Sequence, residues 1–209
     1  MRGNRFSRMR IFSAFCAAAL TAATLSPALA AEPDAASEKP AAAATTEAAT
    51  GNRLDALFGQ LKRERNEKAA ERIASRISEE WNHSGSASID LMMTWSQTAM
   101  EGKKFDVALD FLDQVVTMEP TYAEGWNRRA TVHFMMQNYA KSMADISHTL
   151  QLEPRHFGAL SGMGQIMKNT GRDELALQAW QRVLDIYPMM RSAQDEVATL
   201  SEELAGEGI

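Results

Sequence analysis

Three prolines, Pro120, Pro154 and Pro188, stand 34 residues apart, and this interval constrains the fold more than any other feature. Proline commonly follows the end of a helix because it cannot continue one. Small residues recur at two fixed places before each proline; they are Ser96, Ala130 and Gly164 at the first place and Ala108, Ser142 and Ala176 at the second. Because small side chains let two helices approach closely, the interval predicts a row of equal helical hairpins.

The complete pattern resembles that of the tetratricopeptide repeat (TPR) family, whose repeats are 34 residues long. The family's bulky first position is filled by Met92, Trp126 and Leu160 in turn. The resemblance implies an all-α, right-handed superhelical solenoid, in which antiparallel helical hairpins bury their apolar faces only by stacking on one another. The repeats that match the pattern are 89–122, 123–156 and 157–190.

The segments that flank these repeats extend the predicted domain over residues 51–209. On the N-terminal side, residues 55–88 fit a degenerate repeat with Phe58 at the bulky position; the alternative is a simple helical hairpin that caps the array. On the C-terminal side, residues 191–206 are predicted to form a capping helix, because the open end of a repeat array requires a cover. The apolar residues of this helix recur at helical spacing; they are Ala193, Val197, Leu200 and Leu204.

Residues 1–30 have the three parts of a secretory signal peptide, namely a basic stretch, an apolar run and a cleavage site. Four arginines precede the apolar run, and Ala28 and Ala30 are the small residues that cleavage requires, so the mature chain is predicted to begin at Ala31. A retained membrane anchor is one alternative, and a lipoprotein processed at Cys16 is another. The expected location is the periplasm of a Gram-negative bacterium.

Removal of residues 1–30 changes the charge and the cysteine content of the chain. The loss of four arginines takes Lys and Arg from 22 to 18 against 27 Asp and Glu, a net charge of −9, and the one cysteine is lost with them. An acidic chain is a poor candidate for binding nucleic acid or an anionic membrane. We therefore expect no nucleic-acid partner, no stable membrane insertion after cleavage, and no cofactor. Residues 31–50 carry no aromatic or β-branched aliphatic residue and are predicted to be a disordered linker.

The family resemblance implies that the first helix of each hairpin lines a concave surface, which binds an extended peptide or a partner helix. The residues at the usual lining positions are Met93, Gln97, Met100, Asn127, Thr131, Phe134, Met135, Ser161, Gln165 and Lys168. Thioethers and an aromatic ring would give this surface an adaptable, partly apolar floor. The alternative is that these Met and Phe side chains are packed by the terminal helix or the linker.

Two comparisons with the family concern charged positions. Some members clamp a C-terminal carboxylate with lysine, arginine and asparagine on successive hairpins. The corresponding positions here are Met93, Gln97, Arg128, Gly158 and Gly162, so we do not expect that clamp. Arg129 stands where leucine is usual, and we expect it to form a structural ion pair with a carboxylate such as Asp145; contact with a ligand is the alternative.

The sequence contains no recognised catalytic or metal-binding pattern. None of the four histidines has a second histidine at a metal-binding spacing such as H-E-x-x-H. The run Ser161-Gly162-Met163-Gly164 lies in a predicted helix, whereas a nucleophile elbow needs a strand-to-helix turn. The sequence therefore predicts a non-enzymatic, exported TPR adaptor that binds another envelope protein or peptide through its concave face, in cell-envelope integrity or assembly. The alternative is a structural envelope protein that self-associates as a homo-oligomer.

Overall fold

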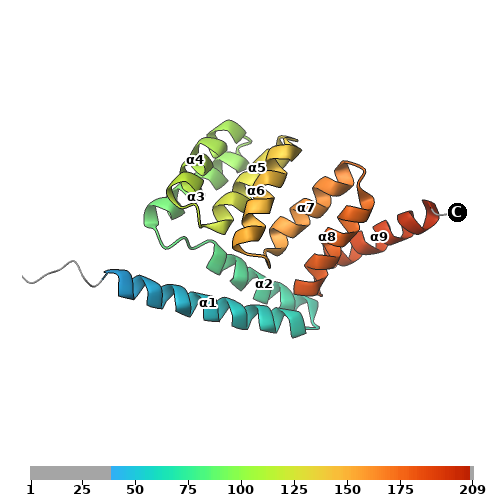
Figure 1. The fold of residues 1–209 in the computed structure, drawn as a ribbon, viewed down its shortest axis with the longest axis horizontal. Coiled ribbons are helices and arrows are strands. Elements are labelled where there is room, and N and C mark those ends of the chain that lie inside the picture. The colour runs from blue at the N-terminus through green and yellow to red at the C-terminus, as the bar shows by residue number, and fades with distance from the viewer. Residues whose placement is uncertain (1–38, 208–209) are drawn as a thin grey trace, which may run out of the picture. The chain divides into compact units, whose positions relative to one another are not determined.

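The computed structural model describes the backbone of residues 39–207 and the side chains of residues 51–206, and every regular element in this part of the chain is a helix (Figure 1). The helices are α1 (Lys39–Arg63), α2 (Glu67–Trp81), α3 (Ala87–Glu101), α4 (Phe105–Met118), α5 (Ala123–Met135), α6 (Tyr139–Leu152), α7 (Phe157–Asn169), α8 (Asp173–Ile186) and α9 (Arg191–Glu207). This confirms the all-α fold class. None of these helices combines the length and the hydropathy that a membrane span needs. The predicted signal peptide and residues 31–38 of the predicted linker lie outside the described residues.

Three antiparallel hairpins, α3–α4, α5–α6 and α7–α8, form the array predicted from the proline interval. The recurring small residues are buried where the paired helices meet. Within the second hairpin, Oγ of Ser142 donates a hydrogen bond to the carbonyl oxygen of Ala130 at 2.8 Å. Gly164 makes a very close contact, because a Cβ at this position would lie 2.7 Å from Nε1 of Trp180. Close packing therefore explains why small residues recur with the period of the repeat.

Each hairpin turns at the same place in its repeat, through a residue with positive φ. These residues are Lys103 (φ 55°), Gln137 (φ 60°) and Gly171 (φ 65°). In every turn the N–H of the next residue donates to a carbonyl of the first helix, which satisfies a backbone group that the helix end leaves free. Glycine adopts this left-handed conformation readily, whereas lysine and glutamine adopt it at a cost.

The C-terminal helix α9 covers the outer side of α8 and closes one end of the array. Ala193 and Leu200 of α9 are fully buried, and they share an apolar cluster with Trp180 and Val183 of α8. Three of the four apolar residues on which the capping helix was predicted, Ala193, Val197 and Leu200, therefore pack on the last repeat.

The N-terminal helices α1 and α2 pack on the third repeat. Leu61 of α1 and Ile77 of α2 share an apolar cluster with Tyr187, which lies in the turn between α8 and α9. The ring of Trp81, the last residue of α2, stacks on His156 at the start of α7, with the ring centroids 4.1 Å apart. The apolar cluster beneath α3 and α4, by contrast, contains no described side chain of α1 or α2. The C-terminal part of α1 and helix α2 thus pack against the third hairpin (Figure 1).

This placement differs from stacking in sequence order, which would put residues 55–88 directly on α3 and α4. The connection from α2 to α3 has no proline; it turns at Gly85 (φ 80°), and Ser84 donates hydrogen bonds to the carboxylate of Asp90. The assignment of residues 55–88 as a degenerate repeat, rather than a capping hairpin, stays a prediction. Helix α1 also begins at Lys39, inside the predicted linker, because an alanine-rich segment favours a helix even where it has little apolar surface to bury.

Candidate functional site

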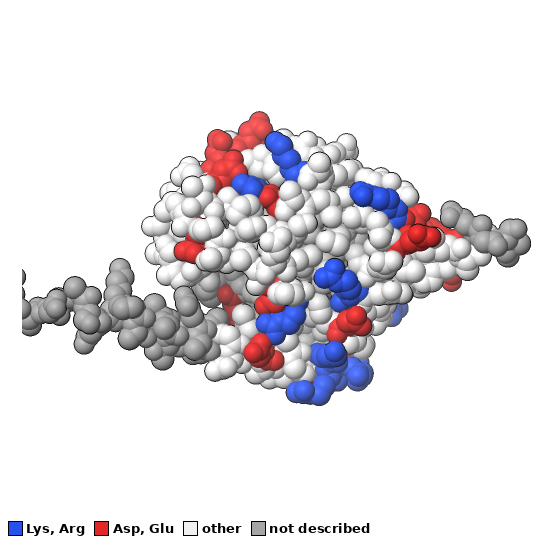
Figure 2. Space-filling view, viewed as in Figure 1, with Lys and Arg blue, Asp and Glu red and all other residues white. Residues whose placement is uncertain are grey.

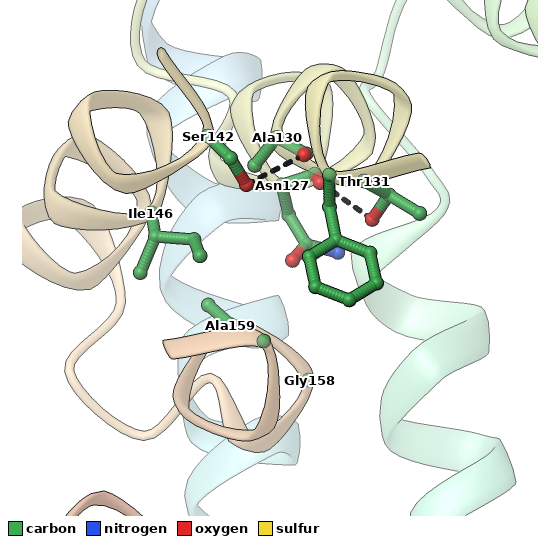
Figure 3. A pocket seen from close by; sticks show the side chains of 9 residues that line it. Asn127, Ala130, Thr131, Ser142, Ile146, Gly158 and Ala159 are labelled. Carbon is green, nitrogen blue, oxygen red and sulfur yellow. Dashed lines mark hydrogen bonds between the residues drawn. The ribbon is translucent and has the colours of Figure 1, made fainter. Parts of the chain in front are cut away.

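The candidate binding surface is formed by the first helices of the hairpins, α3, α5 and α7, and it has a hollow on each side of α5. The first, which we call the α3 hollow, has a volume of about 580 Å³ and is lined by Asn82, His83, Asp90, Met93, Thr94, Gln97, Thr98, Glu101 and Arg128. The second, the α7 hollow, has a volume of about 120 Å³ and is lined by Asn127, Ala130, Thr131, Phe134, Ser142, Ile146, Gly158, Ala159 and Gly162 (Figure 3). Both hollows lie on the helices that the family resemblance assigns to the binding surface.

The α7 hollow exists because α7 carries two glycines, Gly158 and Gly162, one turn apart where it faces α5. A Cβ at Gly162 would lie 3.3 Å from Cδ1 of Ile146, so close packing with α6 accounts for that glycine. A Cβ at Gly158 would meet only the ring of His156, at 3.4 Å. The opposite wall is the half-buried ring of Phe134, which packs on the apolar cluster between α5, α6 and α7. The hollow is therefore mainly apolar and small enough to suit a single side chain.

Asn127 supplies the polar edge of the α7 hollow. Its Nδ2 donates to Oε2 of Glu124 at 3.0 Å, while its Oδ1 accepts no hydrogen bond from the described residues. The hydroxyl of Thr131 donates to the backbone carbonyl of Asn127 at 3.0 Å and is thereby engaged within α5. Because an amide oxygen accepts hydrogen bonds, Oδ1 of Asn127 can receive a backbone N–H from a bound peptide.

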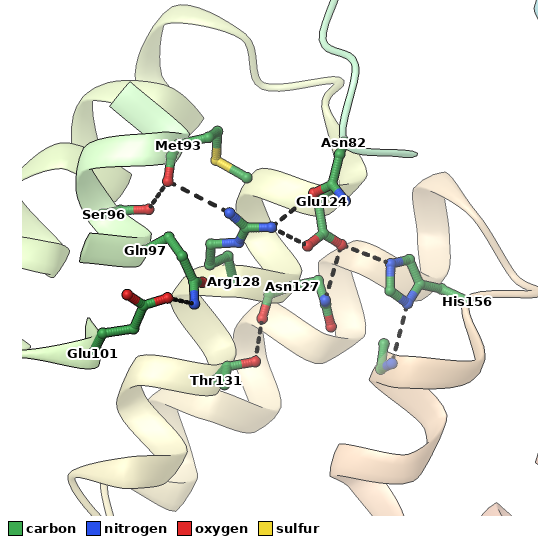
Figure 4. Close-up of polar contacts among 11 residues, drawn as sticks. Asn82, Met93, Ser96, Gln97, Glu101, Glu124, Asn127, Arg128, Thr131 and His156 are labelled. Atoms are coloured by element: carbon green, nitrogen blue, oxygen red, sulfur yellow. Dashed lines mark hydrogen bonds and ion pairs between the residues drawn. The ribbon is translucent and has the colours of Figure 1, made fainter. Parts of the chain in front are cut away.

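A polar network lies between the two hollows and fixes α5 relative to its neighbours (Figure 4). Arg128 of α5 donates to the carbonyl of Met93 in α3 at 3.4 Å and to Oδ1 of Asn82, just after α2, at 2.7 Å. The same guanidinium lies 3.1 Å from Oε1 of Glu124. The other carboxylate oxygen of Glu124 lies 3.1 Å from Nε2 of His156. One arginine and one glutamate therefore connect α3, α5, α7 and the end of α2.

His156 uses both of its ring nitrogens in this network. Its Nδ1 accepts a hydrogen bond from the backbone N–H of Ala159 at 3.1 Å, so the side chain is the N-cap of α7. The proton therefore resides on Nε2, which donates to Glu124. Burial alone would raise the pKa of the Glu124 carboxyl, but hydrogen bonds from His156 and Asn127 and the charge of Arg128 outweigh it and lower that pKa. Glu124 is thus a largely buried carboxylate with each oxygen engaged.

Several predicted lining residues do line the hollows. Met93 and Gln97 border the α3 hollow, although most of the Met93 side chain is buried in the cluster beneath α3 and α4. Asn127, Thr131 and Phe134 border the α7 hollow. Their role in binding stays a prediction, but the structure does bring these five side chains to one surface.

The other predicted residues line neither hollow. Met100 packs against the cluster beneath α3 and α4, and Met135 is exposed on the surface. Oγ of Ser161 donates to a backbone carbonyl of its own helix, and Nε2 of Gln165 donates to a neighbouring asparagine. Nζ of Lys168 lies 2.6 Å from a carboxylate oxygen in α9, so the terminal helix engages this lysine.

The network residues were not predicted as a site. Asp90 and Glu124 stand 34 residues apart, at the same position near the start of a first helix, and this repeated acidic residue was an available signal. The family resemblance singles out Arg128 only as a position of the carboxylate clamp. Asn82 and His156 lie outside the helices, in connections where the repeat has no periodic pattern to read.

Arg129 forms the predicted structural ion pair. Its Nε and one terminal nitrogen lie 2.9 and 2.7 Å from the two carboxylate oxygens of Asp145 in α6. Its other terminal nitrogen lies 2.8 Å from a carboxylate oxygen of Asp113 in α4. The hydrogen bonds to Asp145 raise the pKa of Arg129, and the guanidinium lies 4.7 Å from the centre of the Trp126 ring. Arg129 therefore joins two neighbouring hairpins.

The described histidines, like the described carboxylates, do not gather into a group of three that could hold a metal ion. His156 belongs to the polar network, His148 packs against the Trp126 ring, and His133 is buried, which lowers its pKa. The hollows on α3, α5 and α7 present hydrogen-bonding groups and apolar side chains.

No family model matches the chain. A curated protein from Rhizobium etli, named a TPR repeat-containing protein, is 52% identical over 204 residues, which are 96% of this chain and 98% of that protein. Small glutamine-rich tetratricopeptide repeat-containing protein 2 of Saccharomyces cerevisiae is 28% identical over 117 residues, which are 56% of this chain and 34% of the yeast protein. The relative from Rhizobium etli therefore matches this chain over almost its whole length.

Solved TPR domains share the fold of the repeat region. The first TPR domain of Spaghetti (RPAP3), bound to the HSP90 peptide SRMEEVD, has a TM-score of 0.55 at 22% identity and covers 57% of this chain and 95% of its own. The crystal structure of MamA has a TM-score of 0.53 at 16% identity and covers 66% of this chain and 79% of its own. At such identities these likenesses show the fold alone. The relative from Rhizobium etli, the proline interval and the stacked hairpins together show that the chain belongs to the tetratricopeptide repeat family.

Proposed function

We propose that the protein is a non-enzymatic adaptor that binds a partner protein, through an extended peptide, on the surface of α3, α5 and α7. The observation that carries this proposal is the pair of hollows on either side of α5, with the polar network between them. Some TPR domains of similar fold were solved with peptides or partners, such as RPAP3 with an HSP90 peptide and the TPR2B domain of yeast Sti1 with pHsp70. Sites on rigid helices bind with little reorganisation, which favours a preformed surface of this kind.

The two hollows favour different parts of a ligand. The α7 hollow suits an apolar side chain packed against Phe134, with Oδ1 of Asn127 accepting a backbone N–H of the same peptide. The α3 hollow contains the carboxylates of Asp90 and Glu101, which favour a basic group on the ligand. We therefore propose a ligand in which an apolar residue lies near a lysine or an arginine.

We infer that the surface does not hold a C-terminal carboxylate. Arg128 is the one cation among the residues that line the two hollows, and it already donates to Met93, Asn82 and Glu124. A ligand carboxylate would have to compete with Glu124 for the charge of that guanidinium. The glycines at two positions of the family clamp add no charge.

We further propose that the partner is another envelope protein, with a role in envelope integrity or assembly. The predicted signal peptide in residues 1–30 supports export, and the net charge of −9 in the rest of the chain supports a protein partner over nucleic acid. The proposed location is the periplasm of a Gram-negative bacterium.

The test alters the α7 hollow in two ways and measures partner capture. A photo-crosslinking residue at Gln97, in the α3 hollow, captures the bound protein from an envelope extract. Gly158→Leu fills the α7 hollow without removing a side chain, and Phe134→Glu replaces its apolar wall by a charge. Because a buried anchor contributes about 2 kcal/mol to binding, we expect both variants to reduce capture by about 30-fold while the helical circular dichroism is unchanged.

The matched control is Leu152→Glu, which places the same charge on an exposed leucine that lines neither hollow. This variant should capture the partner as the unaltered chain does. If Gly158→Leu folds and captures the partner at full strength, the α7 hollow is not a binding site. If Phe134→Glu does not fold, the capture measured with Gly158→Leu decides whether the α7 hollow is a binding site.

A further inference from the structure

Helix α3, the first helix of the first hairpin, exposes one side that we call the α3 stripe. The stripe consists of Leu91, Trp95 and Thr98, which lie at helical spacing, and the side chains of Leu91 and Trp95 are 47% and 46% exposed. The ring of Trp95 lies against Phe111 of α4, with the ring centroids 5.4 Å apart. Beside it is an open hollow of about 600 Å³, which Thr98 and Phe111 also line. The stripe is therefore an exposed, mainly apolar surface with room for a further side chain.

The same side of the first helix is covered in both later repeats. The equivalent residues there are buried or largely buried; they are Gly125, Arg129 and Val132 in α5 and Ala159, Met163 and Ile166 in α7. A Cβ at Gly125 would lie 2.8 Å from Cγ1 of Val115 in α4, and the guanidinium of Arg129 lies 2.8 Å from Asp113 in the same helix. Ile166 shares an apolar cluster with Ile146 of α6. In each later repeat, this side of the first helix thus packs on the second helix of the preceding hairpin.

The first repeat does not have the outer surface of a repeat that faces solvent. Terminal repeats normally carry polar residues on their outer side, because an apolar one lowers solubility. Leu91 and Trp95 are instead large and apolar. At the other end of the array the equivalent need is met by α9, which packs on α8 through Ala193 and Leu200. The described residues leave the α3 stripe uncovered, and the later repeats show that a helix is the element that fits such a surface.

The charge around the stripe indicates which kind of helix it favours. In the view of Figure 2 the surface over α3 and α4 is mostly uncharged, with acidic side chains at its upper rim. The two helices contain carboxylates but no lysine or arginine; the carboxylates are those of Asp90, Glu101, Asp106, Asp110 and Asp113. The lysines of this hairpin lie in its turn. The surface therefore favours a basic helix, and it disfavours a second copy of this chain, which would set carboxylates against carboxylates.

We propose that the α3 stripe is a docking site for an amphipathic helix of a different protein, which packs there as α4 packs on α5. The docked helix has aliphatic residues along the side that contacts Leu91 and Trp95, and lysines or arginines beside them that face the carboxylates of α3 and α4. One aliphatic side chain fills the hollow beside Trp95, which is the anchor of the site. Trp95 and Gln97 of the α3 hollow lie on opposite sides of α3, so the docking site is separate from the surface proposed to bind a peptide.

The first test measures the binding of synthetic helices to the full chain by fluorescence anisotropy. The probe is an alanine-rich peptide of about 18 residues, long enough to be helical, with leucine and valine on one side and lysines beside them. We expect Trp95→Ala to weaken its binding by about 30-fold with unchanged circular dichroism, because a buried anchor is lost. Leu175→Ala is the matched control, since Leu175 is 45% exposed on α8, and it should bind the probe as the unaltered chain does.

A reversal of charge tests the acidic rim. A second probe has glutamate in place of every lysine, and we expect the unaltered chain to bind it more weakly than the lysine probe. Asp110→Lys should weaken binding of the lysine probe and strengthen binding of the glutamate probe, each by about 2- to 5-fold, as for other exposed ion pairs. Equal binding of the two probes, failure of the lysine probe to bind the full chain, or unchanged binding to Trp95→Ala would each overturn the proposal.

The second test identifies the natural occupant with a photo-crosslinking residue at Val107, which borders the hollow beside Trp95. Mass spectrometry of the crosslinked segment should find a different protein, with apolar residues at helical spacing and lysine or arginine beside them. Trp95→Ala should abolish this crosslink and leave capture through Gln97 unchanged, which separates the two surfaces. No crosslink, a crosslinked segment of this chain from a second copy or from its own N-terminus, or a segment without that pattern would overturn the proposal.

Discussion

The first and third repeats of this chain share one hairpin geometry but differ in what covers them. The third is packed by α9 on one side and by α1 and α2 on another, so both segments that flank the repeats in sequence gather on it. The first has Leu91, Trp95 and Val107 exposed at positions where a neighbour would stack. The comparison teaches that repeats with the same hairpin fold can differ in what covers them, because the covering depends on where the flanking helices pack.

The largest effect should come from Trp81→Ala, which tests whether α2 is held on the third repeat. The Trp81 ring stacks on His156 and also packs against Phe58 and Phe157. Its removal should lower the free energy of unfolding by about 3–5 kcal/mol, as for other buried aromatic residues. Thermal unfolding measures this loss. A variant as stable as the unaltered chain would show that the two N-terminal helices pack there only weakly.

A pair of leucines tests the contrast between the covered and the open repeat directly. Leu200, in α9, is fully buried, and Leu200→Ala should cost about 2–5 kcal/mol of unfolding free energy. Leu91, in α3 of the first repeat, is 47% exposed, and Leu91→Ala should change the stability of the chain by no more than about 0.5 kcal/mol. Chemical denaturation at low protein concentration gives both values. If both variants lost the same unfolding free energy, the environments of Leu91 and Leu200 would be equally buried.

A pH series tests the network that connects α2 to the repeats. The lowered pKa of Glu124 means that its contribution to stability is present above its unfolded value of about 4.5 and is lost as the pH falls through the folded value. Glu124→Gln should therefore be less stable than the unaltered chain near neutral pH, by about 1–3 kcal/mol. The difference should shrink in acid. If the difference in stability between Glu124→Gln and the unaltered chain stayed constant at every pH, the charge of Glu124 would not be what stabilises the fold.

The smallest effect concerns the hairpin turns of the two repeats. Lys103 has positive φ in the first repeat, while Gly171 holds the same position in the third. Lys103→Gly should raise the stability by about 0.5–1 kcal/mol, since it relieves a left-handed lysine, and Gly171→Ala should lower it by about 1 kcal/mol. Melting temperatures of both variants check the two signs, and a destabilising Lys103→Gly would contradict the argument.

The array could be predicted because its signals are local and repeated. Ser142 and Gly164 stand where close packing demands small residues, and their spacing is visible without a structure. The path of α1 and α2 could not be predicted in the same way. Their amphipathic pattern shows that they bury one face, but not against which surface, and the contact of Asp55 with Arg155 joins residues far apart in sequence.

The candidate site, likewise, could be predicted from the repeat only in part. The repeat register placed Asn127, Thr131 and Phe134 on one hollow, because their positions depend only on the helix that carries them. The network of Arg128 cannot be read from the repeat, since its partners outside α5 are one residue of α3 and two residues of the connecting segments, Asn82 and His156.

The two hydrogen bonds and the ring stack of His156 have a consequence for how α2 separates from the repeats. The His156 side chain caps the start of α7, stacks on the indole at the end of α2 and donates to a carboxylate near the start of α5, so we expect these three helix ends to open together. The imidazole accepts the amide N–H of Ala159, and exchange of that proton with solvent should therefore report the release of α2. A partner that displaces α2 would shorten the lifetime of that proton, and one that binds without displacing it would lengthen it.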